Sequence, residues 1–551
     1  TQKEKLMTNK IVGIDLGTTF SAIAVLDNIG NPEILPDLKN NHITPSAVYI
    51  ASDPSNSKVG SEALAASKAE PARVITEIKT NMRHEVVYSV KEAKWLEKKF
   101  EEKSDEEFTP AQLSSKILEK LKGYTENIDK AVITVPAMFA ARAREATIDA
   151  AKIAGLSGYL TDEVELINEP TAAIFHYANL AGASVAGKVM VFDLGGGTFD
   201  VTIAEVKDKN VEVIHSEGNP NLGGKDIDRD LLKYLSDKYD EQLGAKLNLD
   251  DIDYLTQAED LKKALSARES SAVIIDGPNG PSKKIEVSRS EFNDIIAKRV
   301  DETGVILRQC LKKSNLKTED ISQILLVGGS TRIPAVVKLI EDIMGKAPSK
   351  GVNVDEAVAC GAALYAGKNS PKENLNAAQT KAMSEIDLKD VANHYFGTLV
   401  QTLDPERNAW DILNSTIISK GDTLPASNSK KYALSVDGGY SASVTQSAGQ
   451  TENKEFVHII KQETVNIEGS KEGDEIHVTY SYDKSQVMHC TFEHIKSGKK
   501  FELELKSLSS DTVDKAKKMR SIRTIRMPAE SRRDLSSSTL SRRTRFQKKQ
   551  S

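Results

Sequence analysis

Short apolar runs alternate with amphipathic repeats over about the first two thirds of the chain. Several runs are short, continuous and rich in Val, Ile and Leu, which is typical of buried β-strands: residues 130–139 (KAVITVPAMF), 188–196 (KVMVFDLGG) and 323–329 (QILLVGG). Other stretches repeat apolar positions every three or four residues, as amphipathic helices do: residues 113–124 (LSSKILEKLKGY) and 226–239 (DIDRDLLKYLSDKY). The pattern predicts an α/β domain over residues 9–375.

The pattern changes after a polar connector, which we place at residues 376–392 and which ends in EIDLKDV. From residue 393 to 508, short runs of alternating apolar and polar residues are separated by turn sequences, with little helical periodicity: KKYALSV, EIHVTYSYD and KKFELELKS, with DGG and KSGK between strands. This segment is predicted to form a small antiparallel β domain.

Charge separates the C-terminal tail from the rest of the chain. The 551 residues carry a net charge of −6, but residues 515–551 hold 13 Lys and Arg against two acids, a net charge of +11. Nucleic acid or another polyanion is therefore expected to bind through this tail rather than through the body. We expect residues 509–551 to be a basic, partly disordered tail.

Two further features narrow the class of protein. The sequence has no uninterrupted apolar run of about 18 to 20 residues and no apolar leader, so we expect a cytoplasmic protein without a membrane span. Its three cysteines, Cys310, Cys360 and Cys490, lie far apart and lack the spacing of a zinc site, so we expect neither a disulfide framework nor structural zinc.

A glycine-rich turn between two apolar runs occurs twice, at residues 11–25 (IVGIDLGTTFSAIAV) and 191–203 (VFDLGGGTFDVTI). Glycines let backbone N–H groups approach an anion closely, and neighbouring Thr hydroxyls add donors. An aspartate precedes each turn, and carboxylates suit Mg²⁺ held together with phosphates. A pair of purely structural hairpins is the alternative. The repeated design favours a site for a nucleoside triphosphate with Mg²⁺, built from Asp15, Gly17, Thr18, Thr19, Asp193, Gly195, Gly196, Gly197 and Thr198.

A third glycine turn follows a strand-like run in residues 324–334 (ILLVGGSTRIP). Gly328 and Gly329 leave room for a flat group, and the guanidinium of Arg332 could stack on an aromatic ring. This arrangement suits adenine, although a solvent-facing arginine would give the same pattern.

With these three turns in order, the chain resembles the DnaK-type heat-shock chaperone family, whose ATPase shares its fold with actin and hexokinase. The likeness also includes INEPTAAIFHYA, AVITVPAMFAARAREATIDAAKIAG and NVDEAVACGAALYAG, so it spans the whole first region. The resemblance implies a two-lobed, actin-like α/β ATPase domain, followed by a small antiparallel β-sandwich domain and the basic tail.

The resemblance also implies roles for single residues. Lys79 matches the catalytic lysine that orients the attacking water, and Glu169 and Asp200 would join Asp15 and Asp193 around Mg²⁺ and K⁺. Catalytic roles are implied for Lys79, Glu169, Asp193 and Thr198, and metal binding for Asp15, Asp193 and Asp200. Contacts to ATP or ADP are further implied for Gly223, Gly224, Glu259, Lys262, Ser266, Gly328, Gly329, Arg332 and Asp355.

The family couples its domains through a proline and an arginine that match Pro136 and Arg144. The chain departs from the family at several places. Lys225 stands where an acid is usual, the connector has Leu388 followed by Lys389 instead of a run of leucines, and Ala140, Ala141 and Arg142 replace polar residues. Residues 440–453 (YSASVTQSAGQTEN) lack the large aliphatics of a peptide groove, and no long helical lid is expected after Leu508.

These features together predict an ATP-hydrolysing chaperone, with roles in protein folding and the stress response, that switches its binding of unfolded or extended polypeptide. The resemblance implies J-domain proteins and nucleotide exchange factors as partners, and weak peptide binding. The alternative is a regulatory or co-chaperone module that binds nucleotide but does not hold clients. A metabolite kinase would need a catalytic aspartate beside a second substrate pocket, and the sequence identifies none.

Overall fold

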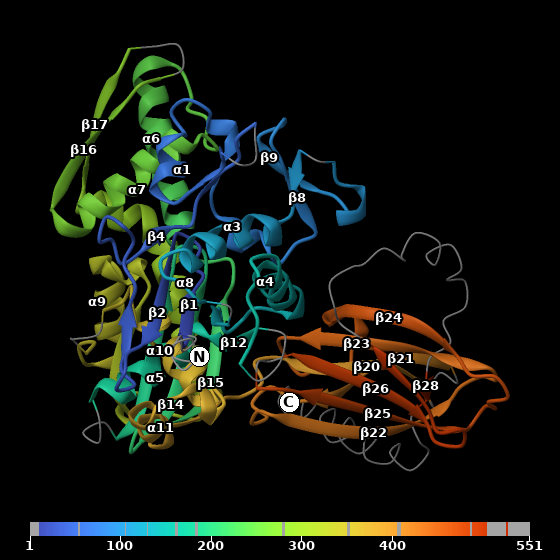
Figure 1. Cartoon of the computed structure of the whole chain (residues 1–551). Helices are drawn as coiled ribbons and strands as arrows, with labels where there is room; N and C mark the ends of the chain where they lie inside the picture. Colours follow the sequence, from blue (N-terminus) through green and yellow to red (C-terminus); the bar gives the residue numbers. More distant parts are fainter. Residues whose placement is uncertain are drawn as a thin grey trace, which may run out of the picture. The chain divides into compact units, whose positions relative to one another are not determined.

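The computed structural model describes residues 10–52, 56–104, 106–128, 130–159, 164–181, 186–277, 281–349, 353–404, 409–484, 487–503 and 525–526. The chain divides into two compact units, with the boundary between Asp390 and Val391 (Figure 1). We describe each unit separately and call them unit 1 and unit 2.

One sheet of unit 1 has the strand order β12-β11-β1-β2-β3, with β4 paired to β2. The first two strands form an antiparallel hairpin, and β11 runs parallel to β1. The strands are β1 (Val12–Asp15), β2 (Phe20–Leu26), β3 (Pro32–Ile34), β4 (Thr44–Pro45), β11 (Val132–Val135) and β12 (Glu165–Asn168).

The second sheet of unit 1 repeats this design in the order β18-β13-β14-β15-β19. Here β13 and β14 form the antiparallel hairpin and β18 runs parallel to β13. Its strands are β13 (Gly187–Leu194), β14 (Phe199–Lys207), β15 (Asn210–Asn219), β18 (Ile321–Val327) and β19 (Asp387–Lys389). The duplicated hairpin expected from the sequence is therefore present, and unit 1 is a mixed α/β structure.

The helices of unit 1 begin where the sequence supplies N-terminal caps. Thr109 and Gln112 form a capping box at one helix, and Ser288 and Glu291 form another. The longer helices are α3 (Pro110–Lys122), α4 (Ala141–Ile153), α5 (Glu169–Ala181), α6 (Gly224–Leu243), α7 (Ile252–Ala267), α8 (Arg289–Lys313), α9 (Pro334–Met344), α10 (Ala357–Asn369) and α11 (Ala377–Ser384).

Helices α5 and α10 pack closely because their contact is made by small residues. A Cβ atom on Gly361 would lie 1.9 Å from the carbonyl oxygen of Ala172, and one on Gly13 of β1 would lie 2.1 Å from the nitrogen of Ala363. Glycine is therefore required at both positions. This packing fixes α10 against the first sheet and against α5, whose N-terminal residue is Glu169.

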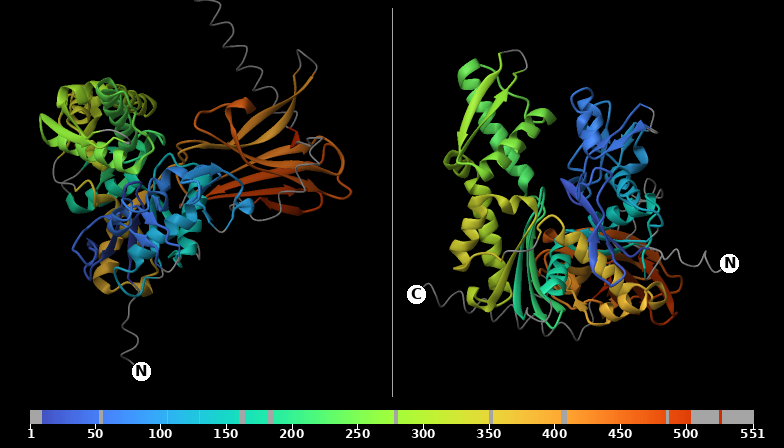
Figure 2. Two further views of the ribbon diagram at one scale, coloured as in Figure 1. Left: turned by 90° about the horizontal axis from the view of Figure 1, so that it is seen from above. Right: turned by 60° about the vertical axis from the view of Figure 1, so that its left-hand side comes forward.

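Small sheets extend from the two large ones. One group contains β5 (Val48–Tyr49), β6 (Lys58–Val59) and β7 (Val74–Ile75), with α1 (Ser61–Ala65) and α2 (Ile78–Asn81) nearby in sequence; another contains β8 (Val86–Ser89), β9 (Lys94–Glu97) and β10 (Glu107–Phe108). The hairpin of β16 (Ser270–Ile275) and β17 (Lys283–Ser288) lies beside α6 and α7, drawn in green in the right view of Figure 2.

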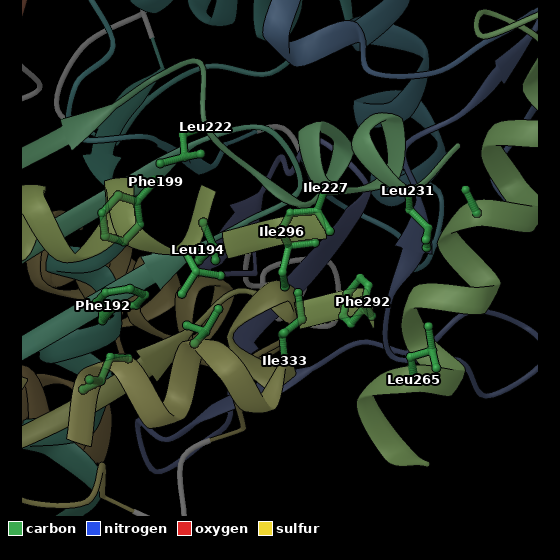
Figure 3. Close-up of a cluster of buried hydrophobic side chains, with 14 of the residues drawn as sticks. Phe192, Leu194, Phe199, Leu222, Ile227, Leu231, Leu265, Phe292, Ile296 and Ile333 are labelled. Atoms are coloured by element: carbon green, nitrogen blue, oxygen red, sulfur yellow. The ribbon is translucent and has the colours of Figure 1, made fainter. Parts of the chain in front are cut away.

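The core behind the second sheet joins strands and helices (Figure 3). Phe192, Leu194 and Phe199 of the β13–β14 hairpin belong to the same buried cluster as Ile227 of α6 and Ile296 of α8. Phe192 and Phe199 pack with their ring centres 4.6 Å apart. The apolar positions that predict strands and helices in this region thus meet in one core, which supports the turn at residues 195–198 from behind.

The predicted connector contributes ordered structure to unit 1. Residues 377–384 form α11, and β19 pairs in parallel with β15 through Asn210↔Asp387, Val211↔Leu388 and Glu212↔Lys389. A single leucine in the connector is therefore sufficient for it to add a strand to this sheet.

Unit 2 consists of antiparallel strands, as the alternating pattern predicts, except for one parallel pairing. The strand order is β24-β23-β20-β28-β22-β25-β26-β27, with β21 paired to β20. The strands are β20 (Tyr395–Asp404), β21 (Ala409–Ile418), β22 (Ala426–Leu434), β23 (Gly439–Ser447), β24 (His458–Asn466), β25 (Glu475–Tyr482), β26 (Met488–His494), β27 (Lys499–Leu503) and β28 (Ile525–Arg526). The expected absence of a helical lid after Leu508 falls outside the described residues, as does most of the basic tail.

The polar residues of β23 are buried. The Ser443 hydroxyl accepts a 2.9 Å hydrogen bond from the Leu399 N–H, and the Thr445 hydroxyl donates to Asn414 Oδ1. The Tyr480 hydroxyl donates to the carbonyl oxygens of Gly397 and Ser443. Polar residues in the segment expected to line a groove therefore bond within unit 2.

Across the part of the chain that the structure describes, we find no helix with both the length and the apolar character needed to span a bilayer. Cys310, Cys360 and Cys490 are all buried free thiols.

Candidate nucleotide-binding site

A cavity of about 320 Å³ opens between the two glycine-rich turns of unit 1. The turns contact each other: a Cβ atom on Gly196 would lie 2.1 Å from Thr19 Oγ1, and one on Gly197 would lie 3.1 Å from Thr18 Cγ2. Because each turn follows the first strand of one of the duplicated hairpins, the repeat in the sequence becomes two facing turns. Such turns are suited to hold a chain of phosphates from both sides.

The second turn is held by backbone hydrogen bonds. The Gly195 N–H donates to the Thr198 carbonyl oxygen at 3.0 Å, and the N–H groups of Gly224 and Lys225 donate to the carbonyl oxygens of Gly195 and Gly196. Gly223 lies so close that a Cβ atom would be 2.4 Å from the nitrogen of Gly197. The start of α6 is thereby fixed against the turn.

The carboxylates of Asp15, Glu169 and Asp193 lie together at one end of the cavity, which we call the phosphate end, and the buried carboxylate of Asp200 lies next to them. Asp15 ends β1, Asp193 precedes the second turn, and Asp200 is its strand partner across the hairpin. Burial and the Glu169 carboxylate raise the pKa of Asp15 and of Asp200 to about 7. Burial, Glu169 and Asp200 raise the pKa of Asp193 well above its usual value. A bound cation would relieve this repulsion, since it stabilises the charged carboxylates.

Hydrogen bonds orient two of these carboxylates. Thr134 of β11 donates its hydroxyl to Asp15 Oδ1 at 2.8 Å, and the N–H of Ala137 donates to Asp200 Oδ2 at 3.1 Å. Asp200 Oδ1 is buried without a hydrogen-bond partner. The described residues contain no cluster of three or more His, Cys, Asp or Glu side chains arranged to hold a metal ion. Asp15 and Asp193 nevertheless suit Mg²⁺, which usually keeps several waters and binds few carboxylates besides the phosphates.

Lys79 supplies the positive charge among these carboxylates. Its ammonium pairs with Glu169 Oε1, and the two side chains are 5% and 10% exposed. The same ammonium lies 5.7 Å from the centre of the Phe139 ring. Lys79 comes from the short helix α2, so a segment distant in sequence brings the cation to the phosphate end of the cavity.

The opposite end of the cavity has the expected adenosine residues. Gly328 has a positive φ of 80° and lies so close to β13 that a Cβ atom would be 2.4 Å from the Leu194 carbonyl oxygen. Arg332 donates two hydrogen bonds to the carboxylate of Asp355, at 3.1 and 2.8 Å. Its side chain stays 56% exposed. The ion pair holds the flat guanidinium at the cavity wall, where a planar base can stack on it.

A network of charged residues forms the wall contributed by α6 and α7. Lys225, at the position where the resemblance implies an acid, pairs with Glu259 at 3.1 Å, and Lys262 pairs with Asp228 at 2.8 Å. Burial alone would raise the pKa of Glu259, but Lys225, Lys262 and Lys263 together lower it to about 2. Glu259 is therefore an ionised hydrogen-bond acceptor beside the cavity. One of its carboxylate oxygens already pairs with Lys225.

Most of the expected site residues line this cavity: Asp15, Gly17, Thr18, Thr19, Lys79, Glu169, Asp193, Gly195, Gly196, Thr198, Gly224, Glu259, Lys262, Ser266, Gly328, Gly329, Arg332 and Asp355. Gly197, Gly223 and Asp200 are not among the lining residues. The two glycines allow close packing behind the turns, and Asp200 lies behind them bonded to Ala137.

Sequence reasoning missed three residues of this site. Asp228 is fully buried although it lies on a helix, Ser330 donates to the Gly195 carbonyl oxygen at 3.0 Å, and Thr134 orients Asp15. A carboxylate on the apolar face of α6, next to Ile227, was a usable signal because buried acids are normally paired. Ser330 and Thr134 gave no such signal.

A continuous set of hydrogen bonds runs from the site to the connector. Ala137, whose N–H bonds to Asp200, follows Pro136, and its carbonyl oxygen lies 3.5 Å from Arg144 Nη2. The same Nη2 donates to Asn168 Oδ1 at 2.7 Å, and Asn168 Nδ2 donates to Asp390 Oδ2 at 2.9 Å. Arg144 itself is 2% exposed. The helix that carries it begins after Ala140 without a side-chain cap.

Comparison with known protein families gives one match over most of the chain. The sequence model of the family described as Hsp70 protein matches residues 11–540. The matched range includes every residue of the cavity, the connector and the described strands of unit 2.

Proposed function

The chain belongs to the Hsp70 protein family, and on this premise we propose that it hydrolyses ATP in unit 1 in order to change the affinity of unit 2 for extended polypeptides. ATP-dependent chaperone activity, with ATP or ADP and Mg²⁺ as cofactors, is the general property of the family. The proposal for this chain is carried by one observation: the cavity between the duplicated turns is linked to the connector through Ala137, Arg144, Asn168 and Asp390.

At the phosphate end, the turns after β1 and β13 hold the triphosphate between them. Asp15 and Asp193 would hold Mg²⁺, mostly through its waters, and we propose that Glu169 and Asp200 hold K⁺ in the same region. The cation supplies charge neutralisation for the phosphates when it is bound. The raised pKa values of Asp15 and Asp200 support this assignment, because carboxylates that repel one another are stabilised by a cation.

At the adenosine end, Arg332 stacks on the base while Glu259 accepts from the ribose hydroxyls. Asp355 holds the guanidinium in place, and Lys262 is held by Asp228. Gly328 lets the chain pack against β13, and Gly329, where an added Cβ would meet no atom within 4 Å, leaves space for the ring. Binding energy at this end positions the γ-phosphate at the other end, which is the main contribution a protein makes to phosphoryl transfer.

Lys79 is the proposed catalytic cation. Its ammonium is buried beside Glu169 at the phosphate end, where the medium around it is poor in water. A fixed positive charge there stabilises the charge that develops on the transferring phosphoryl group, and it orients the attacking water. Thr198 and Asp193 flank the same position on the second turn.

Coupling between the units is proposed to follow the hydrogen-bonded path to the connector. A change at Asp200 would shift Ala137, whose carbonyl oxygen faces Arg144, and Arg144 is bonded to Asn168. Asn168 bonds to Asp390, the last residue of unit 1. The nucleotide could thereby alter how firmly β19 stays paired with β15.

For unit 2 we propose weak and short-lived binding of extended polypeptides. Strand-like docking supplies main-chain hydrogen bonds, but pockets for side chains supply most of the discrimination. The polar side chains of β23 are buried and bonded within the unit, so they add little apolar surface to a bound peptide. J-domain proteins and nucleotide exchange factors are the proposed partners of unit 1, and polyanions those of the basic tail.

A second candidate function is a regulatory or co-chaperone module that binds nucleotide but holds no client. The internal bonding of β23 favours it, since a client groove needs exposed apolar pockets. The two functions differ in one measurement, the dissociation constant of a fluorescent peptide in saturating ATP and in saturating ADP. Tighter binding in ADP supports the chaperone, and equal or absent binding in both supports the module.

A single-turnover experiment adds a second readout. One equivalent of radiolabelled ATP is mixed with the protein, with and without excess peptide, and phosphate release is followed. The chaperone is expected to hydrolyse ATP faster in the presence of peptide. A rate that peptide does not change favours the regulatory module.

A further inference from the structure

The short helix that carries Lys79 begins in an uncommon backbone conformation. Helix α2 spans only Ile78–Asn81, and Glu77, the residue before it, has a φ of 54° and a ψ of 27°. This left-handed region is unusual for residues other than glycine, and asparagine tolerates it best among the others. A helix of one turn has little stability of its own. Contacts outside α2 must therefore hold Lys79 in place.

Two such contacts join α2 to the segment at the start of α6. Glu77 Oε2 pairs with Arg229 Nη2 of α6 at 2.7 Å. Beyond the other end of α2, Arg83 Nη1 donates to Asn221 Oδ1 at 2.5 Å. Glu77 is the more buried partner of the ion pair, with 15% of its side chain exposed against 46% for Arg229. The helix of Lys79 is thus tied on both sides to the segment that begins α6.

The start of α6 is in turn bonded to the second glycine-rich turn. The N–H groups of Gly224 and Lys225 donate to carbonyl oxygens of this turn at 2.9 and 2.8 Å. Thr80 of α2 lies against the same turn, since a Cβ atom on Gly197 would be 2.6 Å from Thr80 Cγ2. Arg229 follows in the same helix. Its ion pair therefore connects the helix of the proposed catalytic cation with a turn proposed to hold the phosphates.

We propose that Arg229 is a positioning residue, which fixes the ammonium of Lys79 at the place of the γ-phosphate through its ion pair with Glu77. The inference rests on the proposed function of unit 1 and adds two residues to its mechanism. Neither Glu77 nor Arg229 is among the residues that line the cavity. Both therefore act through Lys79 rather than on the nucleotide.

The ion pair matters most when a nucleotide is bound. In the structure the Lys79 ammonium pairs with Glu169, which also holds α2 in place. A phosphate that competes for this ammonium weakens the contact with Glu169, so the contacts of Glu77 and Arg83 then carry more of the anchoring. The left-handed backbone at Glu77 costs conformational energy, which the ion pair helps to offset. A misplacement of about 1 Å at a reacting group can cost about 10²-fold in rate.

The test measures single-turnover hydrolysis and ATP affinity in variants of the full-length protein. Arg229→Gln removes the cation of the pair. Glu77→Asn removes the carboxylate but keeps a residue that tolerates the left-handed backbone. We expect each variant to hydrolyse ATP about tenfold more slowly, with a dissociation constant for ATP that stays within about twofold, because only the position of Lys79 changes.

A double variant decides whether the two residues act through one contact. Glu77→Asn combined with Arg229→Gln should be as slow as either single variant, because the same contact can be lost only once. Asp230→Asn is the matched control. It breaks an ion pair at the next position of α6, where Asp230 contacts Arg299 of α8 at 2.8 Å, and it should hydrolyse ATP like the unchanged protein.

Two results would overturn the proposal. One is a rate for Arg229→Gln that equals the rate of the Asp230→Asn control. The other is a double variant in which the two single effects multiply, since Glu77 and Arg229 would then act independently.

Hydrogen exchange separates this proposal from the proposed function. Exchange of the backbone amides of residues 78–83, followed by mass spectrometry in saturating ATP and Mg²⁺, reports the order of α2 without any need for turnover. Arg229→Gln and Glu77→Asn should exchange faster than the unchanged protein, and Asp230→Asn should not. If the unchanged protein releases no phosphate but shows this exchange pattern, hydrolysis is wrong while the positioning of α2 stands. If it hydrolyses ATP and Arg229→Gln changes neither rate nor exchange, the positioning is wrong while hydrolysis stands.

Discussion

Lys79 of α2 and Glu169 at the start of α5 form a buried ion pair at the phosphate end of the cavity. The two residues are 90 positions apart in the sequence. The pair holds the ammonium where the γ-phosphate would arrive. A bound phosphate would therefore compete with Glu169 for Lys79.

Replacing the cation of this pair should affect chemistry more than binding. We expect Lys79→Ala to bind ATP with nearly unchanged affinity but to hydrolyse it about 10²- to 10³-fold more slowly, as when one donor of an oxyanion-type site is removed. Single-turnover phosphate release measures the rate, and calorimetry measures the affinity. Lys58→Ala, which changes an exposed lysine of β6, is the control. A rate within a factor of two of the unchanged protein would exclude Lys79 from the mechanism.

Asp193 should control the dependence on Mg²⁺. Asp193→Asn keeps the shape of the side chain but removes its charge, so we expect the Mg²⁺ concentration for half-maximal hydrolysis to rise by about 10-fold or more, with a lower maximal rate. The measurement is a Mg²⁺ titration of ATPase activity. Asp301→Asn on the exposed face of α8 should leave the curve unchanged. Coinciding curves for Asp193→Asn and the control would contradict the assignment.

Arg332 should act on the adenosine end alone. We expect Arg332→Ala to weaken ATP binding by about 0.5 to 2 kcal/mol, the usual size of a cation–π contact, and to leave the affinity for inorganic tripolyphosphate unchanged. Calorimetric titration with both ligands measures the difference. Arg268→Ala removes an exposed guanidinium at the end of α7 and serves as the control. An equal loss for the two ligands would place Arg332 at the phosphates instead.

His176 should lower stability on the acidic side, whereas the raised pKa values of Asp15 and Asp200 act in the opposite direction there. Burial lowers the pKa of His176 to about 4, with Glu356 partly opposing the shift. The unfolded chain, with a pKa of 6.5, therefore binds more protons between these two values, so the stabilisation is complete above pH 6.5 and is lost as pH falls toward 4. The full loss is about 3 kcal/mol.

This pH dependence can be measured in unit 1 alone. With Trp410→Phe as the background, Trp95 is the remaining tryptophan and reports unfolding of unit 1 in urea. Between pH 7 and pH 5, the change in unfolding free energy of His176→Gln should differ from that of the Trp410→Phe background by about 2 kcal/mol in the stabilising direction, while His458→Gln in unit 2 should follow the background. The same pH dependence in both variants would show that His176 does not contribute to it.

Asp390 should be needed for coupling rather than for hydrolysis. Asp390→Ala removes the acceptor of Asn168 Nδ2 at the end of unit 1. We expect unstimulated ATP hydrolysis to stay within about twofold, while the acceleration of peptide release by ATP is lost. Stopped-flow dissociation of a fluorescent peptide measures release, and Asp387→Asn, an exposed residue of β19, is the control. If ATP still accelerates release from Asp390→Ala, the path through Asn168 does not carry the coupling.

The local features of the site were predictable because each depends on a short, continuous stretch of sequence. Apolar runs that flank Asp-Leu-Gly gave the hairpins of β1–β2 and β13–β14, and the glycines gave the turns at which the cavity forms. Glu259, Lys262 and Ser266 were implied by the resemblance; they are three and four positions apart, as on one face of a helix, and all three line the cavity.

Long-range pairing was not predictable from those stretches. Lys225 forms an ion pair with Glu259, and Lys262 forms one with the buried Asp228, because α6 and α7 pack side by side. The polar residues of β23 predicted a poor peptide groove. They did not predict that the Ser443 hydroxyl would accept the hydrogen bond of the Leu399 N–H. The pairing of β28 with β20 and β22 joins segments far apart in the sequence, and no local pattern predicts it.

The parallel pairing of β19 with β15 has a consequence for aggregation. As long as Asp387, Leu388 and Lys389 stay paired, they cover part of the outer edge of the second sheet. Release of the connector would expose a strand edge, and exposed edges recruit other chains. The stretch of β15 that release of β19 would uncover is three residues long, from Asn210 to Glu212, and it follows the charged Lys209. Because short, charged edges are poor templates for association, the chain can free its connector with little risk of joining sheets with a neighbour.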